Sequence, residues 1–335
     1  MNNMALNLIP AGITGTGIGV PDRVVTNADL EKIVDTSDEW ITSRSGIKQR
    51  RILEPGYYTS DLAVKAAQGA LAQAGLAAEE LDAIIIGTVT PDYPFPAVAC
   101  VVQEKLGAHR ATAFDLSAGC TGFMFALTTA AQFINTGMYR NILVIGAETL
   151  SRVLNWEDRT TCVLFGDGAG AVILQPVSPG KGILACDLGS DGTGVHLLLQ
   201  TAGGSRYPAC AETVAQKQHT ISMSGKEVFK FAVKVMGETS EKAIAKAGLT
   251  IADMDYFIPH QANIRIIDAA AKRLGLDKDK VFVNVDRYGN TSSASIGIAL
   301  NEAVQEGKIK DGDTIVLVGF GAGLTWGACV LRWGR

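Results

Sequence analysis

Three residues whose side chains can do chemistry stand in separate turns of the sequence: Cys120, His260 and Asn290. Each turn leads from a strand-like segment into a helical pattern, where α/β proteins place their ligands. A thiolate can take an acyl group from a thioester. A histidine and an asparagine can together hold the enolate oxygen left when a malonyl thioester loses CO2. The three residue types therefore indicate carbon–carbon bond formation between thioesters.

Taken singly, each of the three residues has a structural alternative. Cys120 lies in AGCTGF, at the start of a predicted buried helix. The helix N-terminus would lower its pKa from roughly 8.5 to roughly 7.5, but a free cysteine is also a common core residue. His260 follows the strand-like FIP and could instead cap the following helix. Asn290 could be a turn residue or a helix N-cap.

The elements that must position these residues alternate between strand-like and helical patterns, which predicts an α/β fold. Helical patterns cover residues 60–76 and 227–249. The predicted strands are short apolar runs at residues 82–87, 111–116, 141–147, 170–174, 255–260 and 314–321.

An internal repeat relates the two halves of the chain. ALAQAGLAAEELDAII begins at residue 70 and AIAKAGLTIADMDYFI begins 173 residues later, and the same offset separates NILVIG from TIVLVG. We infer a duplicated α/β unit with halves 1–175 and 176–335. The offset carries Cys120 onto Ser293, beside Asn290. The cysteine and asparagine turns are therefore expected to face one central cleft.

Composition excludes several other functions. The chain has 335 residues, 47% hydrophobic and 19% charged, with a formal net charge of −4, which argues against nucleic-acid binding. Six cysteines form no CxxC pair and only four histidines are present, which argues against structural zinc. No glycine-rich stretch gives a dinucleotide or ATP motif. Without a secretory signal or an apolar membrane span, the expected location is the cytoplasm.

Three motifs in order, AGCTGF, HQANIR and GNTSSAS, resemble the β-ketoacyl-acyl carrier protein synthase III family of the thiolase-like superfamily. The resemblance runs from GTGIGVPDRVVTN (15–27) to GFGAGLTWG (319–327). It implies a thiolase-like αβαβα layered fold made of two pseudo-symmetric halves. It also implies a homodimer without metal or redox cofactor, in which an acyl-CoA, most simply acetyl-CoA, condenses with malonyl-acyl carrier protein to begin fatty acid synthesis.

The same resemblance implies roles for individual residues. Cys120 would carry the acyl group, His260 and Asn290 would stabilise the enolate, and the N–H groups of Cys120 and Gly323 would form the oxyanion hole. Phe95 would close the acyl pocket across the dimer interface. The remaining matches concern CoA binding (Thr36, Trp40, Arg44, Arg159, Asn263), the acyl pocket (Phe165, Phe229) and docking of the acidic carrier protein (Lys230, Arg265, Lys272, Arg273).

Alternative interpretations remain open at this point. A related condensing enzyme could supply a polyketide starter or a 3-hydroxy-3-methylglutaryl product, water could discharge the acyl group in a thioesterase, or the chain could bind carrier protein without catalysis. Exposed basic helix faces are also commonly just solvated. The polar segment 203–220 is longer than the plainest family members would have, which leaves the acyl chain length undetermined.

Overall fold

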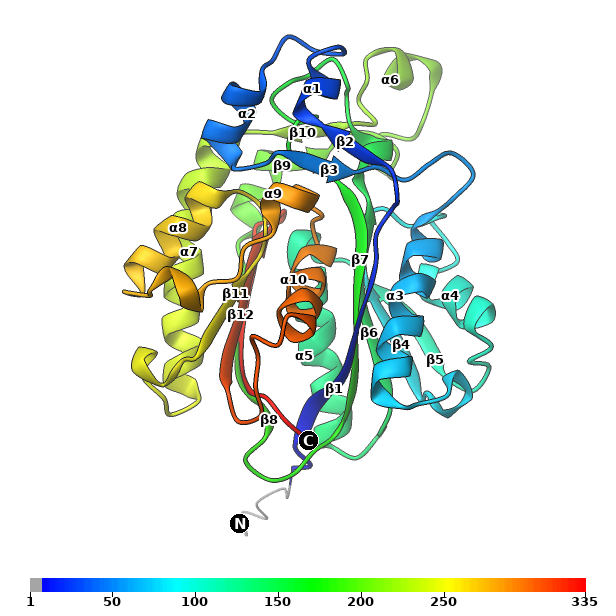
Figure 1. Ribbon diagram of the computed structural model, residues 1–335. Helices are drawn as coiled ribbons and strands as arrows, with labels where there is room; N and C mark the ends of the chain where they lie inside the picture. Colours follow the sequence, from blue (N-terminus) through cyan, green and yellow to red (C-terminus); the bar gives the residue numbers. More distant parts are fainter. Residues whose placement is uncertain (1–7) are drawn as a thin grey trace.

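The computed structural model describes residues 8–335, which form five layers (Figure 1). Two β-sheets enclose a central pair of helices, and a further helical layer covers the outer face of each sheet. This arrangement confirms the predicted αβαβα thiolase-like fold. No helix within residues 8–335 is long and apolar enough to cross a membrane.

The first sheet has the strand order β1-β7-β6-β4-β5. Its strands β4, β5 and β6 run parallel, whereas β1 and β7 pair antiparallel. Helices cover both faces, so its central strands are continuous apolar runs rather than alternating ones. The bounds are β1 (Ala11–Gly19), β4 (Ala83–Gly87), β5 (Thr112–Leu116), β6 (Ile142–Thr149) and β7 (Asp167–Pro176).

The second sheet has the order β11-β12-β13-β8, with β11 and β12 parallel. Its bounds are β8 (Gly182–Ser190), β11 (Tyr256–Pro259), β12 (Thr314–Gly321) and β13 (Thr325–Arg332). All six predicted runs are strands, but β1, β8 and β13 were not predicted. Their sequences contain glycines and polar residues that interrupt the apolar pattern.

The six main helices form three layers. Helices α5 and α10 lie between the sheets, α3 and α4 cover the first sheet, and α7 and α8 cover the second (Figure 1). The predicted helical patterns at residues 60–76 and 227–249 are α3 and α7, and the buried helix predicted after Cys120 is α5. The bounds are α3 (Thr59–Ala74), α4 (Val98–Leu106), α5 (Gly122–Asn135), α7 (Gly225–Lys246), α8 (Ile264–Arg273) and α10 (Ala294–Gln305).

The two sheets repeat one pattern, since β1-β7-β6-β4 corresponds in order and direction to β8-β13-β12-β11. The predicted offset relates the first residues of β4 and β11, of β6 and β12, and of α5 and α10 within one residue. We therefore propose that the halves 1–175 and 176–335 meet at the end of β7.

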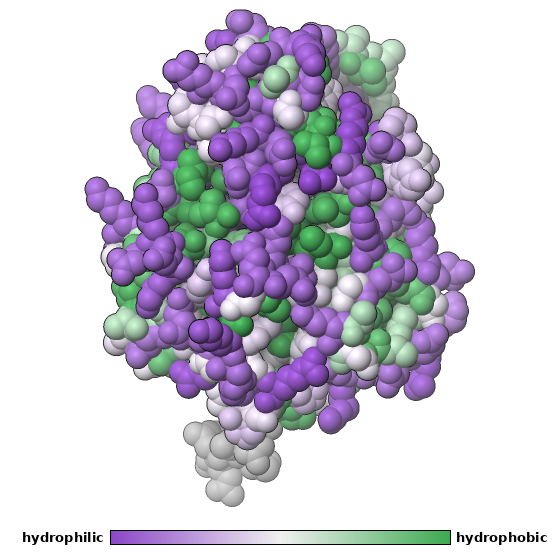
Figure 2. Space-filling view, viewed as in Figure 1, coloured by the Kyte–Doolittle hydropathy of each residue, from purple (hydrophilic) through white to green (hydrophobic). Residues whose placement is uncertain are grey.

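A smaller layer covers the ends of both sheets at the top of Figure 1. It has its own apolar core, which includes Leu30, Ile41, Ile47, Leu150 and Phe165. Seen from the same side, Figure 2 shows a largely hydrophilic surface with separate apolar patches. The layer's elements are β2 (Val24–Thr26), α1 (Asn27–Leu30), α2 (Asp38–Ser45), β3 (Gln49–Arg51), β9 (Leu198–Gln200), α6 (Ala211–Ala215), β10 (Ile221–Met223) and α9 (Val285–Tyr288).

Glycines let the central helices approach the first sheet at backbone distance. A Cβ added to Gly87 would meet the backbone of Gly122 at the start of α5, and one added to Gly146 would meet the Ser293 carbonyl before α10. The two helix starts also touch, because a Cβ on Gly122 would lie 3.4 Å from the Ser293 Cβ. The repeat thus places the cysteine and asparagine turns together, as predicted.

We expect Gly146→Ala to push the Ser293 turn away from the first sheet and to destabilise the fold. Overpacking of this kind lowers the free energy of unfolding by about 1–3 kcal/mol, measurable by chemical denaturation. Gly192→Ala is the matched control, because a Cβ there meets nothing within 4 Å. Equal stability of the two variants would contradict the close packing of this turn.

Candidate active site

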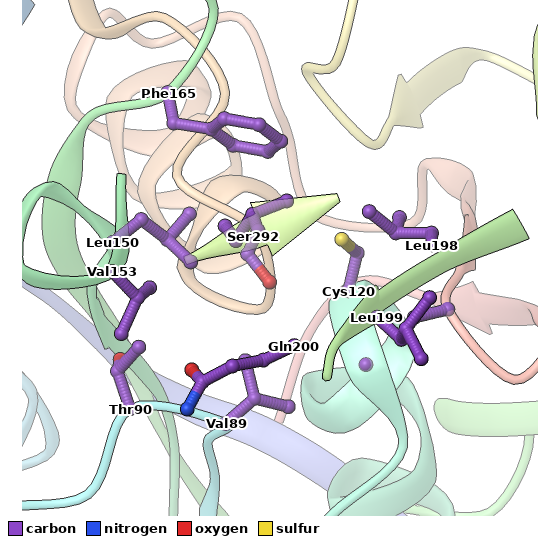
Figure 3. Close-up of a pocket in the computed structure, with 13 residues that line it drawn as sticks. Val89, Thr90, Cys120, Leu150, Val153, Phe165, Leu198, Leu199, Gln200 and Ser292 are labelled. Atoms are coloured by element: carbon purple, nitrogen blue, oxygen red, sulfur yellow. The ribbon is translucent and has the colours of Figure 1, made fainter. Parts of the chain in front are cut away.

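Cys120 lies where two cavities meet, each with a volume of about 180 Å³. The first cavity is mostly apolar and is shown in Figure 3, and the second contains the two other predicted catalytic residues. Cys120, Phe165 and Leu198 line both. The first is otherwise lined by Val89, Thr90, Gly119, Leu150, Val153, Leu199, Gln200, Ile221, Ser292 and Ala322, and the second by residues that include Phe229, His260, Asn263, Asn290 and Gly321.

Cys120 sits in a short 3-10 turn, Gly119–Thr121, that leads directly into α5. Burial raises the pKa of its thiol to about 11, and the charge of Glu148 acts in the same direction. The Ser292 hydroxyl and the N–H of Ala322 lower the pKa and so oppose this increase. The predicted decrease in pKa is therefore not found, because desolvation of the buried anion outweighs the favourable helix start.

His260 directly follows β11 and is 1% exposed. Its Nδ1 lies 2.5 Å from Ser295 Oγ, which also accepts a 3.4 Å hydrogen bond from the Gln261 N–H. The Ser295 hydroxyl is therefore free to donate to Nδ1, which places the ring proton on Nε2. Nε2 has no hydrogen-bond partner within residues 8–335, and the residue lines the second cavity. Burial lowers the pKa of His260 to about 3, so the ring is a neutral donor.

Asn290 is fixed by hydrogen bonds at its backbone and at one side-chain atom. Its N–H donates to Leu164 O at 2.8 Å, and its carbonyl accepts from Gly166 N at 3.0 Å. Its Oδ1 accepts the Ser292 N–H at 2.8 Å. Because Oδ1 is occupied, the Nδ2 amide group is the part left to donate into the second cavity.

Arg50 was not predicted, yet it supports the segment that pairs with Asn290. Its side chain is 0% exposed and donates to Val25 O, Asn27 Oδ1 and Val163 O, the last at 2.7 Å. Burial lowers its pKa to about 10, so it stays charged. The polar run KQRR gave no signal, since such runs are usually exposed.

Glu148 is a second charged residue that the sequence did not single out. It lies near the end of β6, is 0% exposed, and burial raises its pKa. It accepts hydrogen bonds from the segment after β4 and from Ser292 and Ser293 before α10. Its place at the carboxyl end of the apolar run 141–147 is the signal that could have identified it.

The expected oxyanion donor Gly323 belongs to the glycine-rich turn that packs against Cys120. Within this turn, the N–H of Ala322 lowers the pKa of the Cys120 thiol. Ala322 lines the first cavity, whereas Gly323 lines neither cavity. The sequence GFGAG offers several N–H groups, and only the conformation of the turn decides which one faces the thiol.

The predicted CoA-binding residues gather around α2. The guanidinium carbon atoms of Arg44 and Arg159 lie 4.6 and 5.3 Å from the Trp40 ring centroid. A purine stacked between Trp40 and Arg159 requires the ring and the guanidinium to be about 7 Å apart, which is two stacking contacts of about 3.5 Å. Arg159 must therefore move away from its ion pair with Asp35 to admit a purine. Asn263 Nδ2 donates to Arg44 O at 2.9 Å, and the nearby Thr36 Oγ1 is buried without a partner in residues 8–335.

The predicted acyl-pocket residues are only partly brought together. Phe165 lies between the two cavities, and Phe229 lines the second. Phe95 lines neither and is 86% exposed in the single chain. Segment 203–220 connects β9 to β10, which supply the wall of the first cavity, and its Lys217 pairs with Glu157.

The predicted docking residues lie exposed on the outer helices, Lys230 on α7 and the other three on α8. Arg265 stacks 5.2 Å from the Phe229 ring centroid, at the edge of the second cavity. Arg273 pairs with Glu238 and Glu241, which neutralise it locally.

Residues 8–335 contain neither a cluster of metal ligands nor a disulfide. No three His, Cys, Asp or Glu side chains there are grouped to hold a metal ion. All six cysteines are free thiols.

The chain matches two family models, 3-oxoacyl-[acyl-carrier-protein] synthase III over residues 114–192 and its C-terminal counterpart over residues 244–333. It is 61% identical to the β-ketoacyl-[acyl-carrier-protein] synthase III of Desulfitobacterium hafniense, covering 98% of this chain and 99% of that one.

Solved structures give the same result. The 3-oxoacyl-[acyl-carrier-protein] synthase III of Aquifex aeolicus VF5 superposes with a TM-score of 0.89 at 50% identity, over 96% of this chain and 100% of the other. The priming β-ketosynthase of the R1128 polyketide pathway has a TM-score of 0.91 at 35% identity, over 100% and 99% of the two chains.

We expect nitrogen NMR to find His260 neutral, with its proton on Nε2, from about pH 5 to about pH 8. Ser295→Ala removes the donor to Nδ1 and should increase the Nδ1–H tautomer, while Ser295→Thr keeps the hydroxyl and the Nε2–H form. Because the folded pKa lies below the unfolded value of about 6.5, His260 also contributes stability that is complete above that pH and declines as the pH falls below it. An unchanged tautomer in Ser295→Ala would contradict this role of Ser295.

Proposed function

The chain belongs to the 3-oxoacyl-[acyl-carrier-protein] synthase III family, and on that premise we propose how its residues carry out the reaction. The enzyme is an acyltransferase that condenses an acyl group from acyl-CoA with malonyl-acyl carrier protein. The products are 3-oxoacyl-acyl carrier protein, CoA and CO2, and the reaction initiates fatty acid synthesis. The observation that supports the assigned roles is the position of Cys120 between an apolar cavity and a cavity with two hydrogen-bond donors.

In the first half-reaction, the Cys120 thiolate attacks the acyl-CoA carbonyl. The donors for the oxyanion are the N–H group of Cys120 and one from the adjoining glycine-rich turn, where Ala322 lines the first cavity and Gly323 follows it. The tetrahedral intermediate expels CoA and leaves the acyl group on Cys120. The acyl chain then occupies the first cavity, whose small apolar volume suits a short group such as acetyl.

In the second half-reaction, malonyl thioester enters the second cavity. Its carbonyl oxygen accepts hydrogen bonds from His260 Nε2 and Asn290 Nδ2. These two fixed, neutral donors stabilise the negative charge that develops on the oxygen as CO2 is lost. The enolate carbon attacks the acyl-Cys120 carbonyl, and the Cys120 sulfur leaves. A neutral imidazole serves here because its N–H donates a hydrogen bond without adding a buried charge.

The substrates are assigned to two surfaces. CoA lies over Trp40, Arg44 and Arg159, with its pantetheine arm passing Asn263 into the second cavity. The acidic carrier protein docks on Lys230, Arg265 and Lys272, with a smaller contribution from the paired Arg273. We also propose a cytoplasmic homodimer without cofactor, in which the exposed Phe95 closes the acyl pocket of the partner.

We expect one acetyl group on Cys120 when the protein is mixed with acetyl-CoA alone, detected by intact mass and peptide mapping. Malonyl-acyl carrier protein should then remove it. Cys120→Ala should not be acylated, since it lacks the attacking sulfur, whereas Cys329→Ala keeps it and serves as the control. Acylation of the Cys120→Ala variant at the normal rate would exclude Cys120 as the nucleophile.

We expect Asn290→Ala to leave acylation of Cys120 intact while slowing decarboxylation of malonyl-acyl carrier protein. Loss of one donor to a developing oxyanion typically reduces the rate by about 10²–10³-fold. Release of labelled CO2 measures this step separately from acyl transfer. Normal CO2 release by a folded Asn290→Ala variant would remove Asn290 from the mechanism.

A further inference from the structure

A buried carboxyl group lies beside Cys120 and has no part in the steps above. Glu148 Oε2 accepts from Thr90 Oγ1 at 2.5 Å and from Val89 N at 3.1 Å, and Oε1 accepts from Ser293 Oγ at 2.8 Å. No cation within residues 8–335 contributes to its ionisation, and it is fully buried. Burying a carboxylate without an opposite charge lowers the stability of the folded protein unless hydrogen bonds compensate for the lost solvation.

Ser292 connects this carboxyl group to the thiol. Its Oγ donates to Glu148 Oε1 at 3.2 Å, and the same hydroxyl lowers the pKa of the Cys120 thiol. Figure 3 shows Ser292 and Cys120 lining the same cavity. Ser292 has a φ of 49°, an unusual left-handed conformation for a residue other than glycine, and Asn290 Oδ1 holds its N–H in place.

The single hydroxyl proton of Ser292 allows two arrangements of the group. When it points to a Glu148 carboxylate, the serine oxygen can accept the proton of the Cys120 thiol. When it points to a Cys120 thiolate, the serine oxygen can accept the proton of a neutral Glu148. The two arrangements differ only in the positions of two protons, and each carries one negative charge.

We propose that Glu148 is a positioning residue that receives, through the Ser292 hydroxyl, the proton that Cys120 loses when its thiolate forms. Ser292 lines the same cavity as the reacting sulfur, and Glu148 would act on the thiol through Ser292. This relay rests on the proposed role of Cys120 as the nucleophile.

Electrostatics favours transfer over release of the proton to solvent. Ionising the thiol with Glu148 already charged would place a second anion in a buried site, whereas the relay moves one existing charge. The charge of Glu148 raises the pKa of the thiol. The facing segments 88–90 and 290–293 contain no titratable side chain, and His260, across the second cavity, stays neutral.

The protons that the relay moves are balanced over the catalytic cycle. In acylation, the thiol proton passes to Ser292 as the serine proton passes to Glu148, the sulfur–acyl bond forms, and CoA leaves as a thiolate that takes a proton from water. In condensation, Cys120 leaves as a thiolate. The proton on Glu148 then returns through Ser292 to the sulfur, which restores the thiol and the carboxylate.

The test is the pH dependence of Cys120 alkylation by iodoacetamide, followed on the Cys120 peptide by mass spectrometry because the other cysteines also react. With the relay, the thiolate fraction does not depend on solvent protons, so the wild-type rate should be flat between about pH 6 and about pH 9. In the Glu148→Gln variant, the alkylation rate of Cys120 should instead rise about tenfold per pH unit. Near pH 7 this rate should be about 10²-fold lower than in the wild type.

Two further variants separate the relay from a structural effect. Ser292→Gly removes the hydroxyl, and glycine readily adopts the left-handed backbone at this position. Its alkylation rate should depend on pH with the same slope as that of the Glu148→Gln variant. Ser293→Ala removes another hydroxyl bound to Glu148 that is not hydrogen-bonded to the thiol, and should keep the flat profile. Circular dichroism establishes that each variant is folded.

Each result is decisive for the relay. A flat wild-type profile with sloped Glu148→Gln and Ser292→Gly profiles supports it. If the pH profiles of the wild type and the Glu148→Gln variant are parallel, the relay is overturned. Faster alkylation of the Glu148→Gln variant near neutral pH also overturns it, because Glu148 would then only repel the thiolate. If Glu148→Gln does not fold, Ser292→Gly decides alone. Failure of acetyl transfer to wild-type Cys120 would instead refute the proposed function, independently of these profiles.

Discussion

The contact between the starts of α5 and α10 determines the rest of the site. These helices lie between two sheets. Their first residues approach each other and the first sheet so closely that only small side chains fit, at Gly122 of α5 and at Gly87 and Gly146 of the sheet. Because one helix follows the cysteine turn and the other follows the asparagine turn, this contact fixes their separation. The duplicated α/β unit provides the geometry, since each half contributes one central helix and one turn.

Buried polar groups without opposite charges then hold the turns in place. Arg50 donates to carbonyl groups of the segment paired with Asn290, and Glu148 accepts from the residues that follow it. Both charges are compensated by hydrogen bonds instead of ion pairs. Such a network fixes one arrangement because any displaced donor or acceptor would be left unpaired in the interior.

The site itself combines neutral donors with a thiol that resists ionisation. Burial lowers the pKa of His260 and raises that of Cys120, so both groups are uncharged near neutral pH. The same desolvation strengthens each hydrogen bond to an oxyanion or an enolate. A thiolate is therefore expected only transiently, when a nearby group can take its proton.

The sequence indicated the fold class, the repeat and the chemical roles proposed for Cys120, His260 and Asn290, because apolar periodicity and residue type are local properties. The offset of the repeat brought the cysteine and asparagine turns together. The burial of Arg50 and Glu148 beside these turns and the place of Ala322 in the first cavity became known from the tertiary structure alone. It also reversed the expected pKa of Cys120. Burial and hydrogen bonding between distant segments control these features, and no local pattern encodes them.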